Sequence, residues 1–322
     1  MAVKIVDLVK EFNGLKAVNG ISLEIEEGEL FGFLGPNGAG KTTTISILAT
    51  LLKPTKGKAF VNGYDVVKEA EKVRRSIGIV FQDPSLDDQL TARENLDIHG
   101  RLYHMKKEER RKKIKEVLEM VDLIDRKDSL VKTFSGGMKR RLEIARGLMH
   151  SPKILFLDEP TLGLDPQTRR HIWDYIKKLN KEGVTILLTT HYMEEADFLA
   201  NRVAIIDKGK IVAEGNPSQL KDAIGGDVVK IVCNKPKELQ NLLSGIEVKN
   251  VEGTLVLNVQ RAEEVIPKIF NISNKNGIEI KSITYKEPTL EDVFLHYTGR
   301  SYREEEGSEK DRIKMYMRAR RR

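Results

Sequence analysis

The chain has little of several features that define large protein classes. Its 322 residues include one cysteine, one tryptophan and 6% aromatic residues. The single Cys233 excludes a disulfide framework and indicates a reducing compartment such as the cytosol. No apolar run approaches the ~18 residues that a membrane-spanning helix needs, and residues 1–4 lack the pattern of a signal peptide. We therefore expect two domains and a chain that forms no membrane pathway itself.

A large excess of one charge is also missing. The chain carries 55 basic and 48 acidic residues, a formal net charge of +7. Such a mixture predicts interspersed surface charge and argues against nucleic acid as a partner. Residues 303–322 hold eight basic and five acidic residues, an excess of three. We expect 301–322 to be a charged, disordered tail, and the alternative is an anchor to anionic lipid.

What the sequence does contain is a glycine-rich loop between a short apolar run and a helical pattern. The loop is Gly35-Pro36-Asn37-Gly38-Ala39-Gly40-Lys41-Thr42, and Thr43 follows it. Glycines let backbone N–H groups turn toward phosphate oxygens, and a helix N-terminus adds its positive dipole end. Lys41 is expected to reach the β- and γ-phosphates of a nucleotide, and the Thr42 hydroxyl to bind Mg²⁺. A turn that binds nothing is the weaker alternative because the lysine and the threonine are both in place.

A second apolar run ends in two carboxylates. Residues 154–157 are all apolar and precede Asp158, Glu159 and Pro160. This composition predicts a parallel strand buried on both faces, and ligands gather at the carboxyl ends of such strands. We expect Asp158 to hold Mg²⁺ through water and Glu159 to polarise the attacking water. The alternative, in which the pair only caps a loop, is weakened by Pro160, which ends the strand beside them.

A third motif, Ser135-Gly136-Gly137, precedes an amphipathic helical pattern. Alone it is a common helix cap. In the order phosphate loop, Ser-Gly-Gly and acidic strand end, however, the chain resembles the ATP-binding subunits of ABC transporters. The resemblance implies that this motif clamps the γ-phosphate held by a second copy of the chain. Phe134 and Met138 depart from the commonest form of the motif, and both departures resemble the drug-export subfamily of daunorubicin-resistance ATPases.

The resemblance assigns roles to further residues. Gln82 matches the glutamine that touches Mg²⁺ and senses the membrane subunit, and His191 matches the switch histidine at the γ-phosphate. Asp165 belongs to the family's D-loop, and Phe12 matches the aromatic residue that stacks on adenine. Each has a plainer alternative, such as a surface amide, a loop cap or a core side chain. The resemblance therefore implies a catalytic set of Glu159, His191, Lys41 and Gln82.

The fold that these motifs imply is α/β, with a P-loop NTPase (RecA-like) core and antiparallel β and helical subdomains. We expect a nucleotide-binding domain over 1–220, with a helical insertion at about 91–150. Thr91 and Glu94 have the spacing of a capping box there. Beyond 220 the pattern predicts strand 228–233, helix 236–243, strands 246–251 and 255–259, helix 262–272 and strand 278–285. This βαββαβ order is typical of a small ferredoxin-like α+β domain, which we place at 221–300 and expect to regulate or dimerise.

The motifs predict an ATPase, and the resemblance implies that it binds two MgATP between two head-to-tail copies. The resemblance implies that it drives a separate ABC-2 type permease at the cytoplasmic face of a prokaryotic membrane. Export of a drug or another amphiphile fits this subfamily. One alternative is an ABC ATPase that acts on ribosomes or DNA, which would have two cassettes or a long coiled coil. A module that binds ATP without hydrolysing it is disfavoured because Lys41, Asp158, Glu159 and His191 are all retained.

Overall fold

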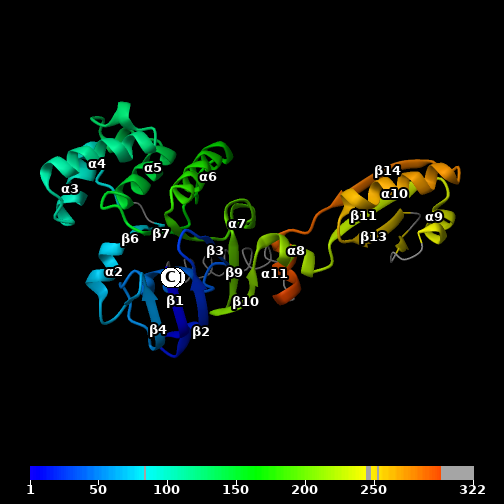
Figure 1. Cartoon of the computed structure of the whole chain (residues 1–322), viewed down its shortest axis with the longest axis horizontal. Coiled ribbons are helices and arrows are strands. Elements are labelled where there is room, and N and C mark those ends of the chain that lie inside the picture. Colours follow the sequence, from blue (N-terminus) through cyan, green and yellow to red (C-terminus); the bar gives the residue numbers. More distant parts are fainter. Residues whose placement is uncertain (83–84, 244–247, 252–253, 299–322) are drawn as a thin grey trace, which may run out of the picture. The chain divides into compact units, whose positions relative to one another are not determined.

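The computed structural model describes residues 1–82, 85–243, 248–251 and 254–298 (Figure 1). The chain divides into two compact units, with the division after Glu214. The sequence placed this boundary at 220, inside helix α8 (Pro217–Ala223). That helix packs against α11 (Leu290–Thr298), so both belong to the second unit. The expected tail at 301–322 lies outside the described residues.

Two sheets form the first unit. The smaller sheet has the order β2-β1-β4-β5, and its neighbouring strands pair antiparallel. The larger sheet has the order β10-β9-β3-β8-β7-β6, and the pairs from β9 to β6 are parallel. The strands of both sheets, in chain order, are β1 (Val3–Phe12), β2 (Leu15–Ile25), β3 (Leu30–Leu34), β4 (Lys56–Val61), β5 (Tyr64–Asp65), β6 (Ile77–Val80), β7 (Ile154–Asp158), β8 (Thr185–Thr190), β9 (Arg202–Asp207) and β10 (Lys210–Gly215).

The parallel strands are rich in apolar residues, as expected for strands that are covered on both faces. Every residue of β3, β7 and β8 is buried. The helices of this unit are α1 (Lys41–Leu48), α2 (Ala70–Ser76), α3 (Ala92–Leu102), α4 (Lys107–Met120), α5 (Gly136–Gly147), α6 (Pro166–Lys181) and α7 (Met193–Leu199), with the 3-10 turns η1 (Ile124–Arg126) and η2 (Val131–Thr133). This strand arrangement puts the carboxyl ends of β3, β7 and β8 at one edge of the sheet.

The helical insertion predicted at about 91–150 consists of α3, α4 and α5. Thr91 caps α3 and completes the predicted capping box, because its side chain accepts from the Glu94 N–H and the Glu94 carboxylate accepts from the Thr91 N–H. Ile114, Val117 and Leu118 of α4 are buried, and their spacing puts them on one face of the helix. In α6 the buried face includes Trp173.

The second unit has the predicted βαββαβ order. Its elements after α8 are β11 (Asp227–Cys233), α9 (Pro236–Leu242), β12 (Val248–Val251), β13 (Thr254–Val259), α10 (Ala262–Lys275), β14 (Ile280–Lys286) and α11. The antiparallel sheet has the order β12-β13-β11-β14, which interleaves the strands as a split βαβ fold requires. Helix α10 runs along the sheet (Figure 1) and contacts β11 and β14. The predicted strand at 246–251 begins at Val248 in the described part.

Among the residues that the structure describes, no helix combines the length and apolar character needed to cross a bilayer.

Candidate nucleotide site

The glycine-rich loop connects β3 to α1 and leaves no room for side chains at two positions. Gly40 has φ +110°, and a Cβ added there would lie 2.3 Å from the Ala17 carbonyl oxygen. A Cβ at Gly35 would lie 2.3 Å from the Ile206 carbonyl oxygen. The loop therefore packs closely against β2 and β9 at these two glycines, and it leads directly into the N-terminus of α1, where a phosphate can bind.

Lys41 is the first residue of α1 and is only 4% exposed. Its ammonium donates to the carbonyl oxygens of Gly35 at 2.7 Å and Pro36 at 3.1 Å. Its Nζ also lies 3.6 Å from Glu159 Oε1. A buried cation is thus held at the loop, next to the catalytic carboxylate predicted from sequence.

Asp158 ends β7 and lies beside the start of α1. Its Oδ1 accepts from the Thr42 hydroxyl at 3.3 Å and from the Thr189 hydroxyl. Its Oδ2 is buried and has no hydrogen-bond partner in the described part of the chain. Burial raises the pKa of Asp158, and the bonds from Thr189 and Thr42 oppose that rise. A buried carboxylate oxygen without a donor, with a threonine hydroxyl beside it, suits a magnesium ion.

Glu159 lies one residue beyond the end of β7 and has φ +48°. This left-handed conformation is uncommon for a residue with a side chain. The Glu159 N–H donates to the carbonyl oxygen and the hydroxyl of Thr189, at 3.1 and 3.2 Å. Its Oε2 lies 3.2 Å from Nδ1 of the buried His191, on the side away from Lys41. The tight turn after β7 therefore places the carboxylate between a cation and an imidazole.

The two adjacent carboxyl groups have opposite pKa shifts. Burial raises the pKa of Glu159, but the His191 ring and the charge of Lys41 outweigh it, so the net pKa is lowered. Asp158 has a raised pKa. Neighbouring acids whose environments separate their pKa values are typical of sites with divided chemical roles. Here Glu159 is held ionised, as a residue that orients a nucleophilic water must be.

Ser135-Gly136-Gly137 begins α5 as expected. Ser135 is the N-cap, and its hydroxyl accepts from the Met138 N–H at 3.3 Å. A Cβ on Gly137 would lie 2.3 Å from Cγ2 of Thr168 in α6, whereas one on Gly136 would meet only Leu164, at 3.6 Å. The second glycine therefore allows a close contact between α5 and α6.

No described hydrogen bond or ion pair connects Asp165, Phe12 or Gln82 to this cluster. Asp165 caps α6 by accepting from the Gln167 and Thr168 N–H groups. Phe12 ends β1 with 43% of its surface exposed, and the Lys10 ammonium lies 4.8 Å from its ring centre. This exposure contradicts the alternative that Phe12 belongs to the core. Gln82 is exposed and follows β6 by two residues. The described contacts thus connect Lys41, Thr42, Asp158, Glu159 and His191 in one cluster. They do not connect Asp165, Phe12 or Gln82 to it.

Sequence reasoning missed three residues around the site. Thr189 bonds both Asp158 and Glu159, and a signal for it was the Thr-Thr pair at the end of an apolar strand. Arg140 donates to backbone around the acidic turn, but nothing distinguishes it within the run Lys139-Arg140-Arg141. Glu195 of α7 is fully buried and accepts from Thr161 and Trp173.

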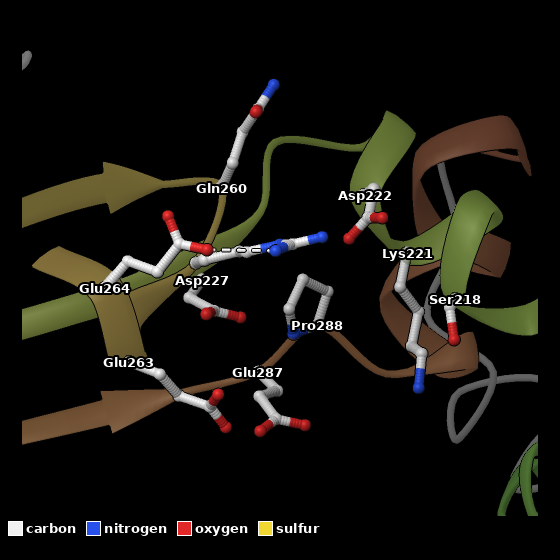
Figure 2. Close-up of a pocket in the computed structure, with 10 residues that line it drawn as sticks. Ser218, Lys221, Asp222, Asp227, Gln260, Glu263, Glu264, Glu287 and Pro288 are labelled. Carbon is white, nitrogen blue, oxygen red and sulfur yellow. Dashed lines mark hydrogen bonds and ion pairs between the residues drawn. The ribbon is translucent and has the colours of Figure 1, made fainter.

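The second unit contains a pocket of about 260 Å³ (Figure 2). Figure 2 shows that Asp227, Glu263, Glu264 and Glu287 contribute carboxylates to its lining. Arg261 also lines the pocket, and its Nη1 lies 2.9 Å from Glu264 Oε1. No group of three or more His, Cys, Asp or Glu residues in the described ranges could hold a metal ion. This pocket therefore adds no metal centre to the part of the chain that can be described.

Comparison with known proteins agrees with both units. The family model "ABC transporter" matches residues 18–162, and the model "ATP-binding protein DrrA1-3-like, C-terminal domain" matches residues 215–298. A solved structure titled as the ATP-binding subunit of an ABC transporter aligns with a TM-score of 0.63 and 27% identity, over 70% of this chain and 94% of that one. A dimeric ATP-binding cassette bound to ADP and Pi aligns with a TM-score of 0.59 and 33% identity, over 66% and 98%.

Relatives at about 40% identity extend over nearly the whole chain. Daunorubicin resistance ATP-binding protein DrrA3 of Streptomyces coeruleorubidus is 41% identical over 93% of this chain and 96% of its own length. Linearmycin resistance ATP-binding protein LnrL of Bacillus subtilis is 40% identical over 92% and 98%. Nod factor export ATP-binding protein I of Cupriavidus metallidurans is 39% identical over 89% and 94%. The chain therefore belongs to the ABC transporter ATP-binding proteins, within the group that has a DrrA-type C-terminal domain.

Proposed function

We propose that this chain hydrolyses MgATP in two composite sites between two copies of itself and thereby powers export through a separate ABC-2 type permease. The observation that carries the proposal is the turn after β7, where Glu159 lies 3.6 Å from Lys41 and 3.2 Å from His191. A lysine, an ionised glutamate and a histidine converge there at the edge of a P-loop sheet. Phosphoryl transfer to water needs this combination of positioning and charge neutralisation.

Each residue has a role that its surroundings support. Lys41 is a buried cation at the phosphate loop, suited to the β- and γ-phosphates. Glu159 has a lowered pKa and can orient the attacking water. His191 is buried beside Glu159 and suits a contact with the γ-phosphate. Gln82, after β6, suits sensing of the permease and a ligand role at the metal. The chain thus retains the groups that distinguish a hydrolase from a module that only binds ATP.

Magnesium fits the donors that the chain provides. The unpartnered Asp158 Oδ2 and the Thr42 hydroxyl lie together at the start of α1. When bound, Mg²⁺ would supply positive charge against the β- and γ-phosphate oxygens. Thr189 holds the other Asp158 oxygen and so orients the carboxylate.

A second copy supplies what one copy lacks. Ser135, Gly136 and Gly137 begin a helix whose N-terminus suits a phosphate, yet their described neighbours lie in α5, in α6 and in the loop just before α6. Asp165 and Phe12 also stand outside the buried cluster, with Phe12 exposed as a stacking surface for adenine. Two-fold pairing of identical subunits would place α5, which we call the signature helix, opposite the partner's phosphate loop.

The proposals for the permease and for the exported compound rest on the relatives. Their names describe drug resistance and Nod factor export. This chain shares with these relatives a cassette followed by a DrrA-type domain. The shared architecture supports ATP-powered export here, at the cytoplasmic face of the membrane. An amphiphilic drug or lipid-like compound is the substrate class that fits these relatives.

Mixed dimers test the composite site. Lys41→Ala and Ser135→Arg should each abolish ATP turnover alone, because every homodimeric site loses one half. Mixing the two variants should restore about a quarter of wild-type turnover, since half the randomly formed dimers hold one intact site. As a control, a chain with both changes mixed with wild type yields mixed dimers without an intact site. The reverse result, no activity in the first mixture and activity from the mixed dimers of the second, would place the site within one subunit.

A further inference from the structure

Arg140 of α5 has an unusual set of partners for an arginine. Only 8% of the residue is exposed, and its guanidinium donates to four backbone carbonyl oxygens. The acceptors are Phe81 at 2.6 Å, Asp158 at 2.9 Å, Glu159 at 3.1 Å and Pro160 at 2.7 Å. Three of these carbonyls belong to consecutive residues of the turn that carries the catalytic glutamate. The fixed fork of the guanidinium is therefore shaped to that turn.

Glu143, one helical turn later, completes the arrangement. It is 2% exposed, and its Oε2 lies 2.9 Å from Arg140 Nη1. Its other oxygen, Oε1, accepts from the Ser85 N–H at 2.8 Å. The pair thus bonds Phe81, just before Gln82, and Ser85, three residues after it. One buried ion pair on the signature helix touches both the Gln82 segment and the Glu159 turn.

The Glu159 turn needs such support. With φ +48°, Glu159 occupies a conformation that costs free energy and persists only where its surroundings hold it. Its N–H is held by Thr189, and its carbonyl oxygen by Arg140. If Arg140 were shortened, three turn carbonyls would lose a buried donor, and the carboxylate could leave its place between Lys41 and His191.

Stability alone explains this pair poorly. A buried ion pair often adds little to folding free energy, because desolvation of both charges offsets their attraction. Its geometric precision, by contrast, matters where a displacement of about 1 Å can cost 10²-fold in rate. The contacts of Arg140 are concentrated on the one turn where such precision is needed.

We infer that Arg140 is a positioning residue for Glu159, and that Glu143 ties this positioning to the segment around Gln82. The inference rests on the proposed role of Glu159 in hydrolysis. Movement of the Gln82 segment would then pull on Phe81 and Ser85 and, through the ion pair, on the turn that presents the glutamate. The signature helix would therefore act on the site of its own chain, in addition to any contact with the partner's nucleotide.

The first test compares two neighbouring arginines in the full-length chain. Arg140→Lys keeps the charge but has a single nitrogen, so it cannot bond four carbonyls. It should lower kcat for ATP about tenfold or more while the Kd for ATP changes less than about threefold. Arg141→Lys is the matched control, because Arg141 donates only to Val121 and Tyr175 among its described contacts. A wild-type kcat for Arg140→Lys, or an equal loss in both variants, would overturn the inference.

The second test is a double-mutant cycle that separates positioning from loss of structure. In a Glu159→Gln background no carboxylate remains to be positioned, so Arg140→Lys should lower the residual single-turnover rate less than about twofold. A residue that only stabilises the fold would lower the rate equally in both backgrounds, and that result would contradict the inference. If Glu159→Gln itself hydrolysed ATP normally, the proposed function would fail, and the cycle would report that failure separately.

Glu143→Gln is the variant that tests the inference if Arg140→Lys does not fold. It keeps the volume and an acceptor for the Ser85 N–H but removes the charge that holds Arg140. It should lower kcat in the same direction with ATP affinity retained. A folded Glu143→Gln protein with wild-type kcat would show that the ion pair does not support the Glu159 turn.

Discussion

The two units of this chain are built on different physical principles. The first unit buries many titratable side chains: Lys41, Arg110, Arg140, Glu143, Asp158, Glu159, His191 and Glu195. In the second unit, Ser273 is the only buried polar residue within the described ranges. Buried charges cost free energy unless they are paired, and proteins keep them chiefly where chemistry needs them. The first unit therefore accepts electrostatic cost for function, whereas the second unit is held together by apolar packing.

The apolar packing of the second unit is regular. Val229 and Ile231 of β11, Leu255 and Leu257 of β13, and Ile269 of α10 are all fully buried. Period-two alternation along β11 and β13 puts these side chains on the face toward the helices. A core of this kind gives a stable domain without creating a chemical site, so changes in it should leave nucleotide chemistry untouched.

If the two units differ in this way, the substitution with the largest effect on ATP turnover should be at Glu159. Glu159→Gln should keep ATP binding and lower turnover at least ~10²-fold, because a neutral amide cannot accept a proton from the attacking water. Turnover and ATP affinity of the full-length variant measure this. The exposed Glu182→Gln is the matched control and should behave as wild type. Near-normal hydrolysis by Glu159→Gln would assign the base role to another residue.

Acid should destabilise the first unit through His99. Burial lowers the pKa of His99 to about 4 from 6.5, with the charge of Arg146 adding to the effect. Stability from the neutral ring is complete above pH 6.5 and falls as pH drops toward 4, because only the unfolded chain then takes up the proton. The expected loss is on the order of 1–2 kcal/mol after allowance for partial exposure.

Thermal unfolding at pH 7 and pH 4.5 measures this effect. His99→Gln should reduce the difference between the two pH values, whereas the exposed His171→Gln should not. An unchanged difference in His99→Gln would show that other groups account for the acid sensitivity.

A conservative change in the second core should affect stability alone. Ile231→Val should lower the unfolding free energy of the second unit by about 1 kcal/mol, the usual cost of one buried methylene. ATP affinity and turnover should stay at wild-type values. Val232→Ala, on the exposed face of the same strand, should change stability by less than about 0.5 kcal/mol. Reduced turnover in Ile231→Val would mean that the second unit contributes to chemistry.

The smallest expected effect is on ATP affinity when the second unit is removed. Truncation after Gly215 leaves every residue of the proposed site in place, so the Kd for ATP should change less than about twofold. We expect weaker dimerisation or poorer coupling to the permease instead, which sedimentation and drug-stimulated turnover would measure. Loss of ATP binding by a folded truncated chain would show that the second unit forms part of the nucleotide site.

The sequence allowed accurate prediction where chemistry depends on local spacing. The phosphate loop, the capping box at Thr91 and the βαββαβ order are all set by residues near one another in the chain, and the structure has each of them. Asp158 and Glu159 were predicted from a strand end, although Glu159 lies in the turn beyond it. Such features depend on backbone requirements that particular residue types meet.

What could not be predicted depends on contacts between distant segments. Arg140 and Glu143 stand among other charged residues, and only the fold shows that they lie against Phe81 and the 158–160 turn. Trp173 and Glu195 pair across two helices, so neither helix alone signals the contact. A charged residue can be identified as buried only from the residues that it contacts in the fold, and the sequence does not show those contacts directly.

Gly137 has a consequence for the choice of mutations in this family. Because a Cβ there would lie 2.3 Å from Thr168 Cγ2, Gly137→Ala would force the Thr168 side chain or α5 to shift within one subunit. Loss of activity in that variant would say nothing about recognition of a partner's nucleotide. Gly136, whose added Cβ would meet Leu164 at an ordinary 3.6 Å, is the informative position. Two adjacent glycines of one motif thus answer different questions when each is changed to alanine.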